Sequence, residues 1–229
     1  MGSDLNTSSR STAPANERGQ VRTLRFRGWS SDAICFLKGI EADNSKTYWQ
    51  ANKEIYDEKV LGPMLALLGE LTEEFGEGRV FRPYRDIRFS ADKSPYKTNI
   101  AAMNDAGYVA LSAKTFSLGS GLHEPSSGQL TSFRSAVADD QSGPELVRLV
   151  AQLRRRKIPV VAQEVLKTAP RGFPQDHPRI ELLRYKDLLA WKEWPVGAWL
   201  ATTEPKRRIV DFLHATEPLR DWLEVNVGI

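Results

Sequence analysis

The sequence predicts an α+β fold in which an antiparallel β-sheet is packed by N-terminal, middle and C-terminal helices. Before residue 76 and after residue 126, apolar side chains recur every three or four positions, which indicates amphipathic helices. Between these limits the period becomes two, and short apolar runs alternate with turn residues, as in sequential antiparallel strands. With 229 residues, 41% of them hydrophobic, the chain is long enough to bury a substantial core.

The helical segments are expected to begin near identifiable capping residues. Ser126 is followed three positions later by Gln129, and Ser142 by Glu145, which are two capping boxes. Pro218 is expected to interrupt the last helix and restart it. We expect helices that begin near Ser31, Ser45, Met64, Ser126, Ser142 and Asp176, and a C-terminal helix that includes Ile209.

The strands are expected to be short and to follow one another along the chain. Gly107 and Gly119–Gly121 are interpreted as bends between them, or, for the second group, as backbone N–H groups that approach a ligand. Leu188–Trp194 is interpreted as an edge strand. The full set is Val80–Phe89, Ile100–Met103, Tyr108–Leu111, Phe116–Leu118, Val160–Leu166 and Leu188–Trp194.

The N-terminal residues, the single cysteine and the apolar runs indicate which class of protein this is. Residues 1–20 are polar and cannot offset the entropy lost on ordering, so we expect a disordered tail followed by one α+β domain over residues 21–229. Cys35 lies among apolar neighbours and is interpreted as a buried structural thiol. No apolar run approaches the roughly 20 residues of a membrane span, and no secretory signal is found, so a cytoplasmic location without a membrane partner is expected.

The net charge of +3 hides an uneven distribution. Residues 41–78 carry nine acidic and three basic side chains, whereas residues 79–98 carry six basic and two acidic ones. The positive charge is therefore local, as a site for a small anion requires.

The stretch from Arg82 to Thr98 concentrates this charge. Period-two alternation places Arg82 and Arg88 on one face of a strand and Arg85 on the other, among apolar side chains. A guanidinium there needs an anionic partner, and arginine presents a fork that fits carboxylate or phosphate. Lys93 and Lys97 follow on a loop that closes over the same anion.

Other chemistries find little support. His123, His177 and His214 lack the spacing of metal ligands, so no metal site and no cofactor is predicted. Asp86 and Asp92 each have a basic neighbour, which favours ion pairing over a glycosidase pair. The sequence assigns no catalytic base or nucleophile, and enzymatic activity stays open.

The same stretch carries a resemblance to a known family. Arg82–Lys97, together with Trp49–Tyr56 and Gly119–Pro125, resembles the family catalogued as domain of unknown function 2461. Arg134 and the segment from Asp176 to Lys186 are similar to later motifs of that family. The resemblance spans about Phe26 to Leu223 and implies a shared architecture and a recurring polar site, without an activity.

Three hypotheses follow for this site. The first is binding, with or without conversion, of a small ligand that bears phosphate or carboxylate. The second is a nucleic-acid-binding or regulatory module that adds Arg154–Lys157 and Lys206–Arg208. The third is a structural network that links Arg85 and Arg88 to acids of the 41–78 helices. The candidate ligand-binding residues are Arg82, Arg85, Arg88, Lys93, Lys97, Asn52, Tyr56, Tyr96, Arg134 and Lys186.

Overall fold

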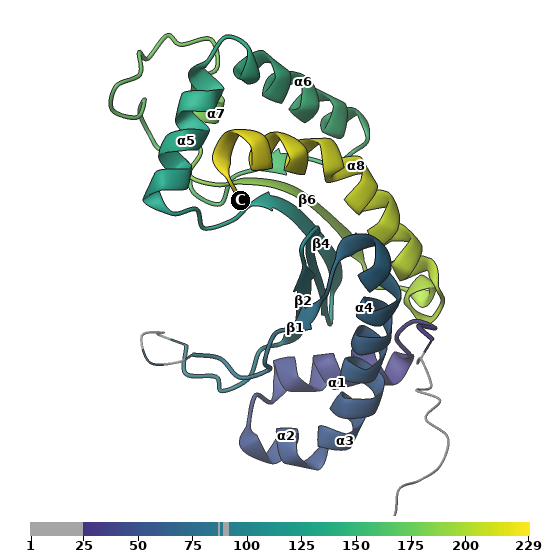
Figure 1. Cartoon of the computed structure of the whole chain (residues 1–229). Coiled ribbons are helices and arrows are strands. Elements are labelled where there is room, and N and C mark those ends of the chain that lie inside the picture. The colour runs from purple at the N-terminus through teal and green to yellow at the C-terminus, as the bar shows by residue number, and fades with distance from the viewer. Residues whose placement is uncertain (1–24, 87, 89–91) are drawn as a thin grey trace, which may run out of the picture.

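The computed structural model describes residues 25–86, 88 and 92–229, so the expected tail lies outside the described residues. Within them, six strands form one antiparallel sheet in the order β1-β2-β3-β4-β6-β5. Helices precede, interrupt and follow these strands, which confirms the predicted α+β fold (Figure 1). The strands are β1 (Arg79–Val80), β2 (Asn99–Asn104), β3 (Gly107–Ser112), β4 (Thr115–Leu122), β5 (Val160–Val161) and β6 (Leu188–Pro195).

Two strand predictions are wrong in ways that matter for the site. β6 pairs with β4 on one side and β5 on the other, so it is not an edge strand. β4 continues through Gly119–Gly121, which pair with β6 and do not end the strand as a bend would, although the φ of Gly121 is +132°. The predicted strand over Val160–Leu166 pairs continuously only at β5, and Val165 makes an isolated bridge with Tyr185.

The helices begin close to the predicted residues. Ser45 accepts a hydrogen bond from the backbone N–H of Tyr48, and the capping box at Ser126 is confirmed. The helices are α1 (Ser31–Ala42), α2 (Lys46–Ala51), α3 (Lys53–Ile55), the π-helix η1 (Tyr56–Leu61), α4 (Gly62–Phe75), α5 (Ser127–Ala138), α6 (Ser142–Arg155), α7 (Ile180–Leu183), the 3₁₀-helix η2 (Ala198–Ala201) and α8 (Glu204–Val227).

Three helix predictions are wrong. The box at Ser142 does not form, because the Ser142 hydroxyl donates to the carbonyl of Ala136 instead (2.8 Å). The cap of α7 is Arg179 and not Asp176. Pro218 lies inside one continuous helix, α8, whose buried residues on both sides of the proline hold the two halves on the same core.

The sheet has one covered and one open face. Side chains such as Ile100, Val109, Leu111 and Phe116 belong to the core and lie beneath the helices. Figure 1 shows α8 and α4 on the convex side of the curved sheet, while no labelled helix crosses its concave side. Because successive side chains of a strand point to opposite faces, the alternate positions line this open concave face.

The single cysteine departs from expectation. Cys35 is exposed, because it lies off the stripe of α1 that buries Ala33, Phe36, Leu37 and Ile40. Among the described helices, none combines the length and apolar character that crossing a membrane would need.

Candidate functional site

Residues 82–86 and 92–98 lie antiparallel to one another, with a bridge between Tyr84 and Tyr96, and form a ribbon that continues the β1–β2 edge of the sheet (Figure 1). The N–H of Arg85 donates to the carbonyl of Pro95 (2.9 Å), and that of Lys97 donates to the carbonyl of Pro83 (2.7 Å). The predicted strand is nevertheless interrupted, since β1 ends at Val80. Prolines in both arms of the ribbon supply no N–H donors, which prevents a full ladder.

An aromatic cluster holds the ribbon against the N-terminal helices. Trp49 stacks on Tyr96, with ring centroids 4.5 Å apart and planes 8° apart. The ring centroid of Tyr56 also lies close to that of Trp49, at 4.8 Å. Tyr56 and Tyr96 are 6% and 5% exposed, and burial, followed by the charge of Asp57, raises the pKa of Tyr56 to about 12. These two predicted ligand-binding residues therefore act as a buried anchor.

Asn44 fixes the same part of the ribbon through its side-chain amide. Its Nδ2 donates to the carbonyl of Tyr96, and its Oδ1 accepts from the N–H of Tyr96, both at 3.0 Å. Sequence reasoning did not predict that Asn44 binds the ribbon backbone. The available signal was its position just before the helix cap Ser45. Asn52, another predicted ligand contact, donates its side-chain amide to the carbonyl of Tyr48 one helical turn earlier (2.9 Å).

Two of the ribbon's arginines are paired with carboxylates of the ribbon itself. Arg85 forms an ion pair with Asp92, and Arg88 forms one with Asp86 at 2.7 Å. The third hypothesis named acids of the N-terminal helices, and the structure shows different partners for these two guanidiniums. Because the pairs are partly or largely exposed, they contribute little to stability. Arg82 and Lys93 also lie on the exposed surface of the ribbon.

The pKa of Asp92 gives a direct test of the ribbon's geometry. Hydrogen bonds from the Ser94 hydroxyl and N–H, then from Arg85, lower this pKa from 3.8 to about 2. The ionised form is thus favoured in the fold, and its contacts are lost only as pH falls through about 2. We expect Ser94→Ala and Arg85→Gln each to raise the pKa of Asp92, as measured by NMR titration of the side-chain carboxyl carbon. Equal titration curves for both variants and the parent protein would contradict this geometry.

Arg85 and Lys97 line a groove of about 480 Å³ where the ribbon meets the sheet. The Lys97 ammonium lies 5.3 Å above the ring of Phe81. Partial burial, followed by the charge of Arg82, lowers the pKa of Lys97. A cation held over an aromatic ring beside a second cation is placed to receive an anion. The groove is lined by Phe81, Arg85, Lys97, Thr98, Asn99, Ala101 and Tyr108.

This groove adjoins a hollow of about 410 Å³ on the concave face, and Phe81 and Tyr108 line both. We call the two together the concave groove. Its floor includes Trp191, whose ring lies 5.9 Å from that of Tyr108 with planes 25° apart. A Cβ atom on Gly119 would lie 2.8 Å from the Trp191 ring, so this glycine allows the indole to lie against the sheet.

Sequence reasoning did not identify the floor of the concave groove. Phe81, Tyr108 and Trp191 were not candidates, although each is a large aromatic at the end of, or within, a segment expected to be extended. The available signal was Gly119, because a glycine within a strand leaves room for the side chain of a neighbouring strand. Only the sheet register places Tyr108 and Trp191 on either side of Gly119.

Arg220 occupies the opposite end of the groove. Its Nη1 donates to the Thr216 hydroxyl and to the Leu213 carbonyl, each at 2.9 Å, and burial lowers the pKa of the guanidinium. Within the described residues, no carboxylate lies within ion-pair distance of Arg220. His123 and Gln163 also line this end.

The remaining candidates lie on other elements. Arg134 is on α5, where its Nε is buried without a hydrogen-bond partner among the described atoms. Lys186 precedes β6 and pairs with Glu164 at 2.6 Å. The residues that line the concave groove include Arg85 and Lys97 but not these two. In the described part of the chain, no group of three or more His, Cys, Asp or Glu side chains is placed to hold a metal ion.

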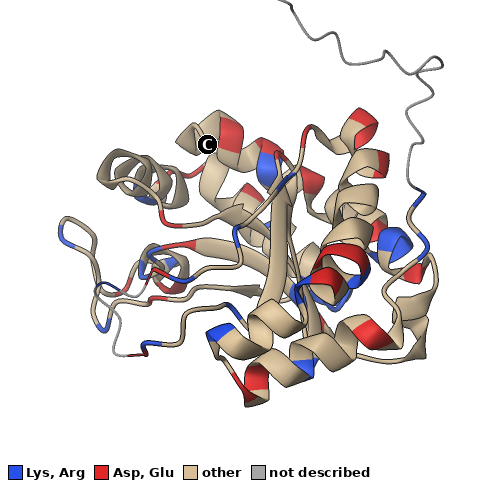
Figure 2. Cartoon of the chain, turned by 90° about the horizontal axis from the view of Figure 1, so that it is seen from below, with Lys and Arg blue, Asp and Glu red and all other residues tan. Residues whose placement is uncertain are grey.

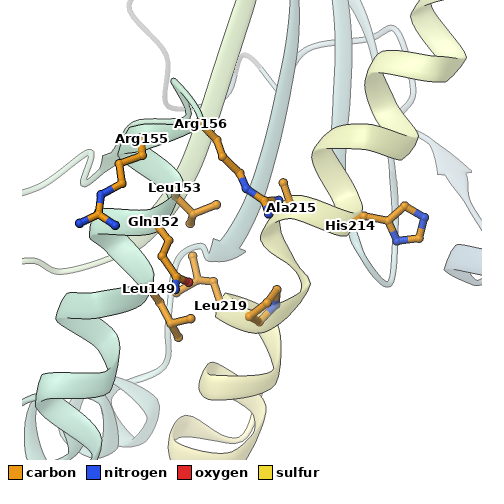
Figure 3. Close-up of a pocket in the computed structure, with 9 residues that line it drawn as sticks. Leu149, Gln152, Leu153, Arg155, Arg156, His214, Ala215 and Leu219 are labelled. Carbon is orange, nitrogen blue, oxygen red and sulfur yellow. The ribbon is translucent and has the colours of Figure 1, made fainter.

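The basic clusters of the second hypothesis are interleaved with acidic side chains. Arg207 and Arg208 both pair with Glu204, and Lys206 pairs with Glu70. Figure 2 shows the same mixture of basic and acidic residues along the helices. In a pocket of about 360 Å³ between α6 and α8, Arg156 reaches toward Ala215 while Arg155 points away (Figure 3). Arg156 of the first cluster and Arg207 and Arg208 of the second line one pocket, where Glu204 and Asp211 lie among these cations.

Comparison with known proteins gives one match. No curated protein and no solved structure matches the chain. A family model described as "Conserved hypothetical protein (DUF2461)" matches residues 32–222, a span that contains the ribbon, all six strands of the described sheet and most of α8. The chain therefore belongs to this family of conserved hypothetical proteins, as the resemblance predicted.

Proposed function

We propose that the concave groove binds a small ligand through a phosphate or carboxylate group. The observation that carries the proposal is that Arg85 and Lys97 line one groove together with the aromatic side chains of Phe81 and Tyr108. Cations that are partly withdrawn from water beside apolar surface are stabilised by an anion at hydrogen-bond distance.

Lys97 is the strongest element of this proposal. Its ammonium lies over the ring of Phe81, and no carboxylate of the described residues lies within ion-pair distance of it. Arg85 does have a partner, Asp92, but that carboxylate is 51% exposed and lies on the ribbon loop. An incoming anion therefore neutralises Lys97 directly and shares Arg85 with Asp92.

The groove supports binding more directly than catalysis. Hydrogen bonds from Arg88 lower the pKa of Asp86, and hydrogen bonds from Ser94, then from Arg85, lower that of Asp92, which disfavours a role of either as a general acid. What the cations offer to a reaction is electrostatic stabilisation of developing negative charge. The proposal is accordingly a binding protein for small anions.

The test uses inorganic phosphate as the probe. We expect phosphate to shift the NMR signals of the backbone around Phe81, Lys97 and Tyr108, and Lys97→Met to weaken its binding about tenfold, a loss of roughly 1.4 kcal/mol. Lys114→Met is the matched control, since Lys114 pairs with Glu41 away from the groove. Equal affinities for the two variants, or shifts confined to other surfaces, would overturn the proposal.

A further inference from the structure

We infer that the ligand of the concave groove carries a flat aromatic ring that stacks on Trp191 and Tyr108, so that its class is the aromatic carboxylates and phosphates. This inference rests on the proposed anion site and adds the chemistry of the rest of the ligand. The observations that carry it are the register of the sheet, the glycine beneath Trp191 and the placement of the cations.

The register places a row of side chains at one level across the concave face. Met103 is the cross-strand partner of Tyr108, Tyr108 of Gly119, and Gly119 of Trp191. Cross-strand partners point to the same face of a sheet. Four neighbouring strands, β2, β3, β4 and β6, therefore contribute to one continuous floor.

Gly119 leaves room on this floor for the ring of Trp191. The nearest atoms to a Cβ built there are two ring carbons of Trp191, at 2.8 Å. The Trp191 ring thus occupies the space that a side chain at position 119 would fill. Trp191 is only partly buried and lines the hollow, so the rest of its surface is directed to the groove.

Two further rings extend the same surface. Tyr108 lies 5.9 Å from Trp191, and Phe81 lies 6.3 Å from Tyr108. Three aromatic residues on a sheet face that no described helix covers are costly to leave in water, whereas a flat apolar ring covers them with favourable geometry. The volumes of about 410 and 480 Å³ are those of small-molecule pockets.

The charges lie at the ends of this aromatic floor. Lys97 and Arg85 stand at the ribbon end, and Arg220 stands at the other. A ligand whose anionic group meets Lys97 therefore places its adjoining ring over Tyr108 and Trp191. This complementarity selects an aromatic anion over a neutral ring or a bare inorganic ion.

The test compares three probes by calorimetry: 2-naphthoate, its saturated analogue decahydronaphthalene-2-carboxylate, and inorganic phosphate. We expect naphthoate to bind at least tenfold more tightly than the saturated acid. Trp191→Leu should remove this preference, and Trp191→Phe should retain part of it. Trp194→Leu is the matched control, because Trp194 lies on the same strand but packs against Phe116 on the covered face.

Each outcome separates the two proposals. If all three probes bind but the two carboxylates bind equally, the aromatic inference fails while the anion site stands. If no probe binds, both fail. If Trp194→Leu weakens naphthoate as much as Trp191→Leu does, the assigned floor is wrong. Should Trp191→Leu not fold, as judged by circular dichroism, Tyr108→Leu tests the same floor from β3.

Discussion

Trp49→Ala is expected to lower the free energy of unfolding by about 3–5 kcal/mol, the cost typical of deleting a buried tryptophan. Trp49 is 5% exposed and contacts Phe36, Tyr56 and Tyr96 at ring distances between 4.5 and 5.9 Å. Because the stack on Tyr96 joins the ribbon to the helices, the loss is expected to loosen the ribbon before the rest of the fold. Urea unfolding measures the loss of free energy of unfolding.

Hydrogen exchange at the N–H of Tyr96 measures the loosening of the ribbon in Trp49→Ala. That N–H donates to Asn44, so its exchange reports on the ribbon and not on the sheet. Asn44→Ala is the reference variant, because it removes the acceptor of this N–H, leaves the aromatic stack in place and so gives the exchange rate expected when only this hydrogen bond is lost. If Trp49→Ala accelerated exchange no more than it accelerated global unfolding, the ribbon would not depend on this anchor.

Gly121→Ala is expected to destabilise the protein by more than the roughly 1–3 kcal/mol that a strained backbone position costs. Gly121 has a φ of +132°, which side chains rarely adopt. A Cβ there would also lie 2.3 Å from the carbonyl oxygen of Leu188, at the start of β6. Relief of this clash requires β4 and β6 to separate, so the groove floor is expected to change together with stability.

Gly172→Ala isolates the contribution of the backbone angle. Gly172 has a φ of +91°, yet no atom lies within 4 Å of a Cβ built on it. We expect a loss of about 1 kcal/mol there. The difference between the two variants in chemical denaturation then measures the clash with Leu188. Equal losses would show that the strands part easily at this point.

Local patterns predicted most of the fold. The change from helical to period-two spacing located the sheet, and Ser45 and Ser126 marked their helices because capping depends on neighbouring residues. The position of β6 could not be predicted in this way. Its partner β4 precedes it by the whole of α5, α6 and α7, and the strand's own sequence contains no record of which strand lies beside it.

The candidate site was predictable in its charges but not in its arrangement. The density of cations around Arg85 and Lys97 was visible in the sequence, and both line one groove. The ion pairing of Asp86 and Asp92 was predicted and is confirmed, whereas the third hypothesis was wrong in naming acids of the N-terminal helices as the partners of Arg85 and Arg88. Trp191 joins the site only through cross-strand register, which is a tertiary property.

The sheet order also has a consequence for the order of folding. Strands β1 to β4 pair with their neighbours in sequence, so they require only short loop closures. β6 must then pair with β4 across the intervening helices, and β5 has no partner among the described strands until β6 is in place. We therefore expect a nascent chain to form the ribbon and the first four strands early, and to complete the groove only after residue 195 is available.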